Sequence, residues 1–496
     1  MSIRSKLYKG SLWSVSSQGL TLSIQFGLTL VLAFKLGPDA YGLLGMVTVI
    51  TGFVGYFTEF GLIASIVQKK EVDDLDCDTV FWSSIFLSII IYAAVYFAAP
   101  LMGLYYANQV SDKQELILIT RVIFIDFLIK PFNFIPAALE IKKIKYDLIS
   151  ISGIISVAIS AVIALILAFM DYGVWALVYQ QLSSTFCSTI LLWIFTKWSP
   201  KMQFSVERFK TLFSFGTHVT FNNLIKFFSG NVDNLLVGRL LGPRELGIYT
   251  LAFRLSRYPL EKGWSFFGKM LFPAFSTFQD NIERLRKNFL RISIGGGLVL
   301  IPPLLIIFFG AESIIVLLGK KWASSIDQMA LIIRIFAGYL IVQTVCYADE
   351  PMLMALKKVH IMNSYKTLIS VLLLVFGFFG IRYYGLNGMA WVYMVMTLLY
   401  IVTIKLVLSR MLGVRIYDFL KNTKHIVYYG VLVAAAGFAV YFFMPDSVMP
   451  GKFGQVLFLI ILCLVIGAVS IAMMLSSKIL KSRKPFFDID GIIYFR

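Results

Sequence analysis

The 496-residue chain is too apolar to fold as a set of water-soluble domains. Hydrophobic residues make up 58% of it and charged residues 15%, with 44 Phe and 24 Tyr, whereas soluble chains are about half apolar and about a quarter charged. A disordered chain is excluded for the same reason, and the composition predicts an integral membrane protein. The formal net charge of +18 must then be explained by where the basic residues lie relative to the membrane.

The lengths of the apolar segments predict an all-α fold with fourteen membrane-spanning helices. A bilayer core of about 30 Å requires about 20 apolar residues per helix. The expected spans are 11–34, 42–67, 80–105, 116–138, 148–170, 173–196, 211–238, 246–275, 289–309, 328–352, 361–382, 386–409, 425–444 and 454–476. The loops between these spans are too short to hold a soluble domain.

Basic residues are divided unequally between the two sides of the predicted membrane. The loops on the side of the N-terminus, together with both termini, hold 27 Lys and Arg residues, and the opposite loops hold eight. Because such residues accumulate in cytoplasmic loops, we expect both termini in the cytoplasm. The basic charge is thereby assigned to topology and to contact with anionic membrane lipids, and nucleic acid is not expected as a partner.

The sequence offers little support for an enzyme or a metal site. It has no G-x-x-x-x-G-K-[ST] loop for ATP, its four Cys residues lack C-x-x-C spacing, and no nucleophile–base–carboxylate set is apparent. The pairs Asp76/Asp78 and Asp488/Asp490 resemble carboxylates that hold a metal-bound sugar nucleotide, but no soluble domain surrounds them. We interpret both pairs as solvated loop charge.

The chain contains an internal repeat. Three motifs occur twice in the same order, at offsets of 205, 215 and 212 residues. They are Leu36–Gly42 (LGPDAYG) and Leu241–Gly247 (LGPRELG), Pro136–Lys143 and Pro351–Lys358, and Tyr172–Gly173 and Tyr384–Gly385. Six spans per repeat give two halves with parallel orientation and a cavity between them. We expect an N-terminal six-helix lobe over 1–200, a C-terminal six-helix lobe over 201–415, and two additional helices with a basic cytoplasmic tail over 416–496.

A polar stripe follows one face of the seventh predicted span. At 100° per residue its members fall within an arc of about 80°. They are His218, Asn222, Lys226, Ser229 and Asp233. Since a charge at the bilayer centre costs about 2.5–3.5 kcal/mol on insertion scales, the stripe must face water, a partner helix or a substrate.

Other predicted spans carry polar faces that extend this pattern. The eighth span has Arg254, Arg257 and Glu261 on one face, with Lys262 at its edge; milder faces include Gln25 on span one, Thr48, Gly55 and Glu59 on span two, and Asp126, Lys130 and Asn133 on span four. The surplus of basic residues on spans seven and eight favours a wet, positive cavity for an anionic substrate such as pyrophosphate. The alternative is a set of buried structural ion pairs: Lys226 or Arg254 with Asp233, Lys130 with Asp126, and Arg257 with Glu261.

Five short motifs are distributed along the chain: Gly10–Trp13 (GSLW), Leu36–Gly42, Glu59–Leu62 (EFGL), Asn231–Arg239 (NVDNLLVGR) and Tyr249–Leu255 (YTLAFRL). They resemble motifs of the polysaccharide transporter family, part of the multidrug/oligosaccharidyl-lipid/polysaccharide exporter superfamily. The resemblance extends over about residues 1 to 476, and the family includes O-antigen, colanic acid and teichuronic acid flippases.

The resemblance implies a fold, a substrate and a location. The fold would be two six-helix lobes around a V-shaped cavity, plus two C-terminal helices. The substrate would be an undecaprenyl-pyrophosphate-linked oligosaccharide, moved by alternating access across the bacterial cytoplasmic membrane, with polysaccharide polymerase machinery as a further partner. No catalytic residue or cofactor is implied beyond a coupling ion, H⁺ or Na⁺. Lipid II flippases and cation-coupled drug antiporters of the same superfamily remain alternatives.

Site residues follow from the motifs and from the polar faces. Arg254, inside a matching motif, is expected to contact pyrophosphate, and Asp233, inside another, is expected to bind the coupling ion. The polar faces add further candidates: Lys226, Arg257, Asn222, His218, Gln25 and Lys130 for the substrate, and Glu59 and Glu261 for the ion.

Overall fold

A computed structural model of the chain describes residues 21, 23–59, 61–69, 71–143, 146–196, 198–277, 282–413, 416–444 and 451–476. Over these residues the secondary structure is helical and contains no β-strand, so the predicted all-α class is confirmed. The chain divides into two compact units, Met1–Ile248 and Tyr249–Arg496.

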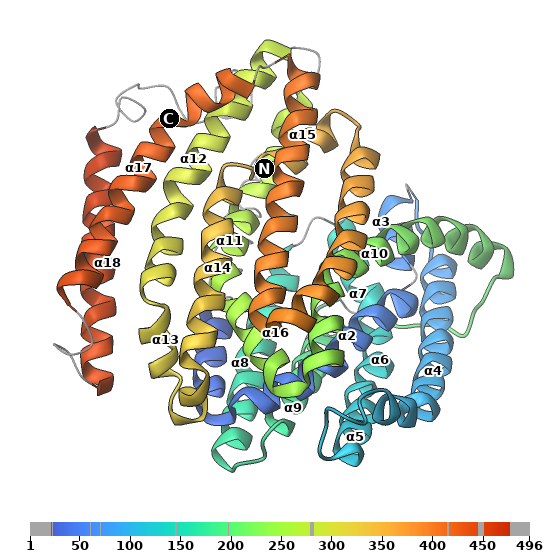
Figure 1. Cartoon of the computed structure of the whole chain (residues 1–496). Coiled ribbons are helices and arrows are strands. Elements are labelled where there is room, and N and C mark those ends of the chain that lie inside the picture. Colours follow the sequence, from blue (N-terminus) through green and yellow to red (C-terminus); the bar gives the residue numbers. More distant parts are fainter. Residues whose placement is uncertain are drawn as a thin grey trace. The chain divides into compact units, whose positions relative to one another are not determined.

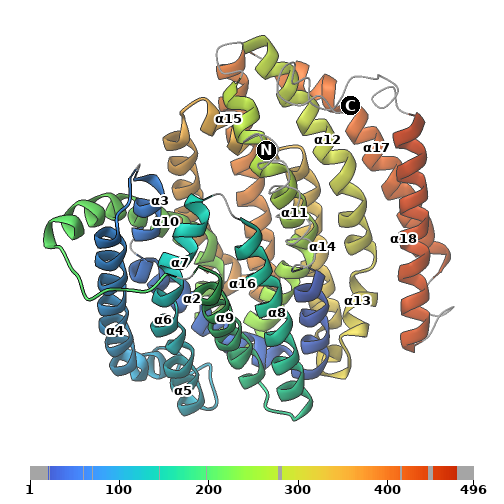
Figure 2. The same ribbon diagram turned by 180° about the vertical axis from the view of Figure 1, so that it is seen from behind.

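The first unit contains the helices that precede the boundary (Figure 1). They are Ser23–Leu36, α2 (Pro38–Glu59), α3 (Leu62–Gln68), α4 (Asp74–Tyr105), α5 (Lys113–Ile123), α6 (Ile125–Ile129), α7 (Pro131–Lys142), α8 (Tyr146–Phe169), α9 (Trp175–Thr196) and α10 (Val206–Leu241). Helices α8 and α9 lie side by side (Figure 2), and α10 packs against α2, α3 and α4.

The second unit begins after the first turn of α11 (Pro243–Thr277). The elements that follow are α12 (Ile282–Phe309), α13 (Ala311–Leu317), the 3₁₀-helix η1 (Lys320–Ser325), α14 (Ile326–Thr344), α15 (Asp349–Ala355), α16 (Val359–Leu412), α17 (Ile416–Phe443) and α18 (Gly451–Ser476). The long α16 is two helices joined at Gly385, whose φ of 58° and ψ of −142° are not helical.

Many of the described helices are long and apolar enough to cross a membrane. Eight meet that condition, and nine do if Lys113–Ile129 and Pro131–Lys142, bent by 41° at their junction, form one broken span. The chain is therefore a multi-pass membrane protein. Helices lie at the position of each predicted span, while the total of fourteen spans stays a prediction.

In two of the three paired motifs, corresponding glycines have similar positive φ values. Gly37 and Gly242 have φ values of 79° and 96°, and Gly173 and Gly385 have φ values of 57° and 58°. These left-handed conformations favour glycine because it has no Cβ. Two connections that the sequence did not predict also correspond: the Trp193 indole donates to the Phe132 carbonyl at 2.5 Å, and the Lys405 ammonium donates to the Val345 carbonyl at 3.3 Å. Both observations support a duplication.

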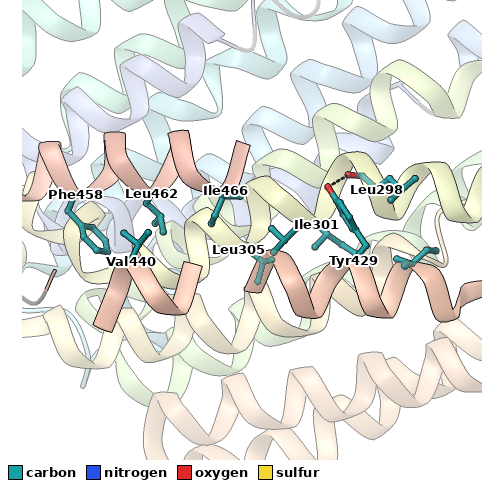
Figure 3. Close-up of a cluster of buried hydrophobic side chains, with 10 residues drawn as sticks. Leu298, Ile301, Leu305, Tyr429, Val440, Phe458, Leu462 and Ile466 are labelled. Carbon is teal, nitrogen blue, oxygen red and sulfur yellow. Dashed lines mark hydrogen bonds between the residues drawn. The ribbon is translucent and has the colours of Figure 1, made fainter. Parts of the chain in front are cut away.

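The last two helices are held to the second unit by an apolar cluster. Side chains of α12, α17 and α18 interdigitate in it (Figure 3), including Leu305, Val440 and Leu462. The Tyr429 hydroxyl, which lies in the same cluster, donates a hydrogen bond of 3.0 Å to the Leu298 carbonyl. In lipid, helices associate through such close packing and interhelical hydrogen bonds.

The two copies of the LGP motif meet within the first unit. A methyl group on Gly42 would overlap the Pro243 carbonyl, and a methyl group on Gly247 would overlap the Pro38 carbonyl. The first turns of α2 and α11 thus approach each other reciprocally, each through its own glycine. Small residues permit this kind of backbone contact between membrane helices.

We expect Gly42→Ala to lower the amount of folded protein in the membrane and its melting temperature, because the added methyl must separate the two turns. Gly153→Ala on α8 is the control, since a methyl there would meet no atom within 4 Å and would gain up to about 1 kcal/mol of helix propensity. The measurement is thermal unfolding in detergent. Equal melting temperatures for the two variants would contradict this account of the contact.

Candidate functional site

The first unit contains an open pocket of about 710 Å³, lined mainly by residues of α2, α7 and α9. We call it the α2–α9 pocket. Its described lining residues are Thr48, Thr51, Gly52, Gly55, Tyr56, Thr58, Ile63, Lys130, Asn133, Phe134, Gln181, Ser184, Thr185 and Ser188. Seven of them carry a hydroxyl group and two carry an amide. The polar faces predicted on span two (Thr48, Gly55) and span four (Lys130, Asn133) therefore contribute to a single pocket.

The threonine hydroxyls of α2 use their protons within the helix. Thr48 donates to the Gly45 carbonyl at 3.0 Å, Thr51 to the Thr48 carbonyl at 3.1 Å, and Thr58 to the Gly55 carbonyl at 2.8 Å. A hydroxyl has two acceptor lone pairs besides its proton. These threonines therefore retain acceptor capacity for a ligand.

A charged group stands at the break in the fourth predicted span. Lys130 lies between α6 and α7, and its ammonium is 2.7 Å from the Asp126 carboxylate. The Asp126 side chain is 1% exposed and that of Lys130 38% exposed. The same carboxylate oxygen, Oδ2, accepts from the Gln181 amide at 3.2 Å, while Oδ1 is buried and accepts no hydrogen bond from the described residues.

The polar face of α9 is a site element that sequence reasoning missed. Gln181, Ser184, Thr185 and Ser188 are spaced by 3, 1 and 3 residues and all line the pocket. That spacing places them on one helical face, and it could have been found by the same test that found the stripe on span seven. The Asn133 amide donates to the Ser188 hydroxyl at 3.3 Å, which connects α7 to α9.

The basic face predicted on the eighth span lies on α11 in the second unit. Arg254 is exposed. Arg257 is 3.4 Å from the Glu261 carboxylate, with both side chains partly exposed, and its guanidinium lies 5.1 Å from the centre of the Phe253 ring. The ion pairs of Arg257 with Glu261 and of Lys130 with Asp126 are thus both present, but of these four side chains Asp126 is the buried one.

The remaining predicted site residues are distributed over three helices. Asp233 on α10 is buried, at 2% exposure, whereas Gln25 on the helix Ser23–Leu36 is exposed. Four other predicted residues have side chains outside the described part of the structure: His218, Asn222 and Lys226 on α10, and Glu59 at the end of α2. Lys262 on α11 falls in the same group.

The interpretation of Asp76 and Asp78 as solvated loop charge is wrong. Both residues lie in the first turns of α4 and are fully buried. The Asp76 carboxylate pairs with the ammonium of Lys69 and, at 3.0 Å, with the guanidinium of Arg208; Asp78 accepts the backbone N–H of Lys201 at 3.0 Å. Basic residues distant in sequence fold back onto α4 and allow these carboxylates to be buried. Asp488 and Asp490 lie outside the described residues.

Outside the membrane helices, Lys201 closes the same network. Its ammonium is 2.7 Å from the Asp74 carboxylate, and this hydrogen bond raises the pKa of Lys201 above its ordinary value. The network joins α4 to the segment between α9 and α10. It is a structural connection, and among the described residues no group of three or more His, Cys, Asp or Glu side chains could hold a metal ion.

Comparisons with known proteins give a consistent result. The sequence profile of the family described as "Polysaccharide biosynthesis protein" matches residues 31–327. The chain is 26% identical over 335 residues to the lipopolysaccharide biosynthesis protein WzxC of Escherichia coli (strain K12), covering 67% of each chain. It is 25% identical over 279 residues to the teichuronic acid biosynthesis protein TuaB of Bacillus subtilis (strain 168), covering 56% of this chain and 57% of TuaB. The solved structure of the lipid II flippase MurJ in an inward closed conformation has a TM-score of 0.67 at 13% identity, over 94% of this chain and 100% of that one.

We expect Lys130→Met to destabilise the protein, because it leaves the buried Asp126 carboxylate without its cation. The loss should be about 1–3 kcal/mol, reduced by the partial exposure of Lys130. The double variant Asp126→Asn, Lys130→Met should recover the melting temperature if the pair is structural. If the double variant is as unstable as Lys130→Met, the instability of Lys130→Met does not come from leaving Asp126 unpaired.

Proposed function

Because the chain belongs to the polysaccharide biosynthesis protein family, we propose that it is a flippase for lipid-linked oligosaccharides. In this proposal it moves an undecaprenyl-pyrophosphate-linked repeat unit across the bacterial cytoplasmic membrane during surface polysaccharide biosynthesis, and both of its termini lie in the cytoplasm. The observation that carries the proposal is the family match over residues 31–327. The names of WzxC and TuaB, which place those proteins in lipopolysaccharide and teichuronic acid biosynthesis, support it.

The α2–α9 pocket provides what such a substrate requires. A sugar headgroup cannot cross hydrocarbon unless the protein replaces the hydrogen bonds that water made to it. The pocket offers hydroxyl and amide groups from Thr51 on α2, a helix long and apolar enough to cross the bilayer, and from Gln181 and Ser188 on α9, among others. The polyprenyl tail needs no such replacement and can stay in the lipid.

Pyrophosphate requires positive charge, and α11 supplies it. Arg254 is exposed and Arg257 is half-buried on the same helical face. Arginine binds phosphate oxygens through paired N–H donors. Arg257 shares its charge with Glu261, so we assign the principal pyrophosphate contact to Arg254.

Two other transport functions are a lipid II flippase and a drug antiporter. The likeness to MurJ, at 13% identity, concerns the fold, and a lipid II flippase would also need polar groups for a sugar headgroup. A drug antiporter would need acidic walls for cationic drugs, and the basic face of α11 disfavours it. The experiments below separate these functions by the intermediate that accumulates when transport stops.

Arg254→Ala should strongly reduce export of surface polysaccharide and cause lipid-linked oligosaccharide to accumulate, because the pyrophosphate loses its charge-assisted contact. Loss of one such contact corresponds to roughly 1.5–3 kcal/mol, a tenfold to hundredfold loss of rate. The matched control is Arg382→Ala on α16, which is also exposed. Extraction of lipid-linked intermediates and surface glycan staining measure the effect. Full export by Arg254→Ala would remove this residue from the substrate site, and accumulation of lipid II would favour the peptidoglycan alternative.

Asp233→Asn should make export independent of the ion gradient or stop it, because the buried carboxylate of α10 is the proposed site of the coupling H⁺ or Na⁺. A charge that crosses 100 mV is worth about 2.3 kcal/mol, enough to drive transport. Export in cells treated with a protonophore or a sodium ionophore is the measurement, and the exposed Asp327→Asn of α14 serves as control. An unchanged response to both ionophores would exclude Asp233 from coupling.

A further inference from the structure

We propose that the α2–α9 pocket is a saccharide-binding subsite, which holds the uncharged, hydroxyl-rich part of the substrate while other residues hold its pyrophosphate. The inference rests on the proposed flippase function and adds to it a site of stated chemistry. It is drawn from four properties of the pocket: its hydrogen-bonding groups, its charge, its apolar surfaces and its place along the helices.

The hydrogen-bonding groups of the pocket both donate and accept. The hydroxyl protons of Thr48, Thr51 and Thr58 are used within α2, so these threonines offer a ligand oxygen lone pairs. Asn133 and Gln181 each use one of their two amide N–H groups, toward Ser188 and Asp126, and keep the other as a donor. The pocket is also lined by the hydroxyls of Tyr56, Ser184, Thr185 and Ser188, which can act as donors or acceptors. A sugar hydroxyl likewise donates and accepts, so the lining matches a polyhydroxyl ligand.

The charge of the pocket leads to the same choice. Of the described lining residues, Lys130 is the charged one, and its ammonium lies 2.7 Å from the Asp126 carboxylate. The pair is neutral as a whole, so an anion would gain little and would have to compete with Asp126. The remaining N–H groups of Lys130 can donate to a sugar oxygen.

Apolar surfaces complete the match to a carbohydrate. Tyr56, Phe134 and Ile63 also line the pocket, and the C–H faces of sugar rings are apolar. The Tyr56 ring is held in place by Phe227 of α10, with ring centres 6.0 Å apart. Phe227 in turn packs against Gly52 of α2. The aromatic wall is thus fixed before any ligand binds, which reduces the entropy lost on binding.

The pocket lies along membrane helices, where polar side chains that lack hydrogen-bond partners are energetically costly. Thr51 lies well inside the candidate membrane span Pro38–Thr58, and Ser184 and Thr185 lie near the middle of α9 (Trp175–Thr196). Polar groups at this depth mark a water-filled or ligand-filled cavity. The volume of about 710 Å³ equals that of roughly 20 water molecules and lies within the usual range of small-molecule sites.

The test compares two probes on purified protein in nanodiscs. One is the oligosaccharide released by mild acid from the lipid-linked intermediates of a strain that lacks this chain; the other is inorganic pyrophosphate. The pocket variant is the double substitution Thr51→Val, Ser188→Ala, and the control is Ser183→Ala on α9, whose hydroxyl donates to the Tyr179 carbonyl and does not line the pocket. A second pocket variant, Ser184→Leu, introduces a larger side chain into the pocket and substitutes no residue of α2. It replaces the double variant if that one fails to fold.

We expect the pocket variants to bind the oligosaccharide about tenfold more weakly, as the loss of two neutral hydrogen bonds implies, with pyrophosphate binding unchanged. Ser183→Ala should bind both probes like the wild type. Equal oligosaccharide binding by the wild type and the pocket variants would overturn the subsite, as would a wild type that binds pyrophosphate alone. Either result leaves the flippase proposal standing, because that proposal fails only if the deletion strain accumulates no lipid-linked oligosaccharide.

Discussion

Hydrocarbon offers no hydrogen bonds, and this constraint acts on the polar groups inside the membrane helices. Thr and Ser side chains donate to carbonyls of their own helix, as Thr51 and Ser156 do. Charged side chains meet partners: Asp126 with Lys130, Asp349 with Lys405 at 2.6 Å, and Glu312 with Arg334 at 2.9 Å. Where hydroxyl and amide groups gather without filling the space between them, as between α2 and α9, the chain forms a pocket instead.

The bend in the fourth predicted span affects the position of Lys130 in this pocket. Pro131 has no N–H to donate and begins α7, so the helix bends by 41° between Ile129 and Pro131. Lys130 stands at that bend, one turn after its partner Asp126. In a continuous helix both side chains would share one straight face. The bend allows the ammonium to line the pocket while the carboxylate stays buried behind it.

The internal repeat determines how close the helices can approach. Its two LGP motifs place Gly42 and Gly247 where each meets the carbonyl of the other copy's proline. The Trp193–Phe132 and Lys405–Val345 hydrogen bonds recur at offsets like those of the motifs, although one donor is an indole and the other an ammonium. These correspondences are what a duplication predicts, although the side chains differ: hydroxyl groups are frequent in the pocket of the first unit, and guanidinium groups lie on the polar face of α11.

The sequence by itself determined the class of the molecule, because apolar length and the absence of soluble loops do not depend on how helices pack. It also predicted the faces of Thr48, Gly55, Lys130 and Asn133, since helical spacing is local. Only the tertiary structure decided which helical faces share a pocket and which carboxylates are buried. It also showed that a face of α9 lines that pocket. Asp76 illustrates the reason: its partner Arg208 is 132 residues away, and no local pattern reports whether a distant cation will fold back to replace water.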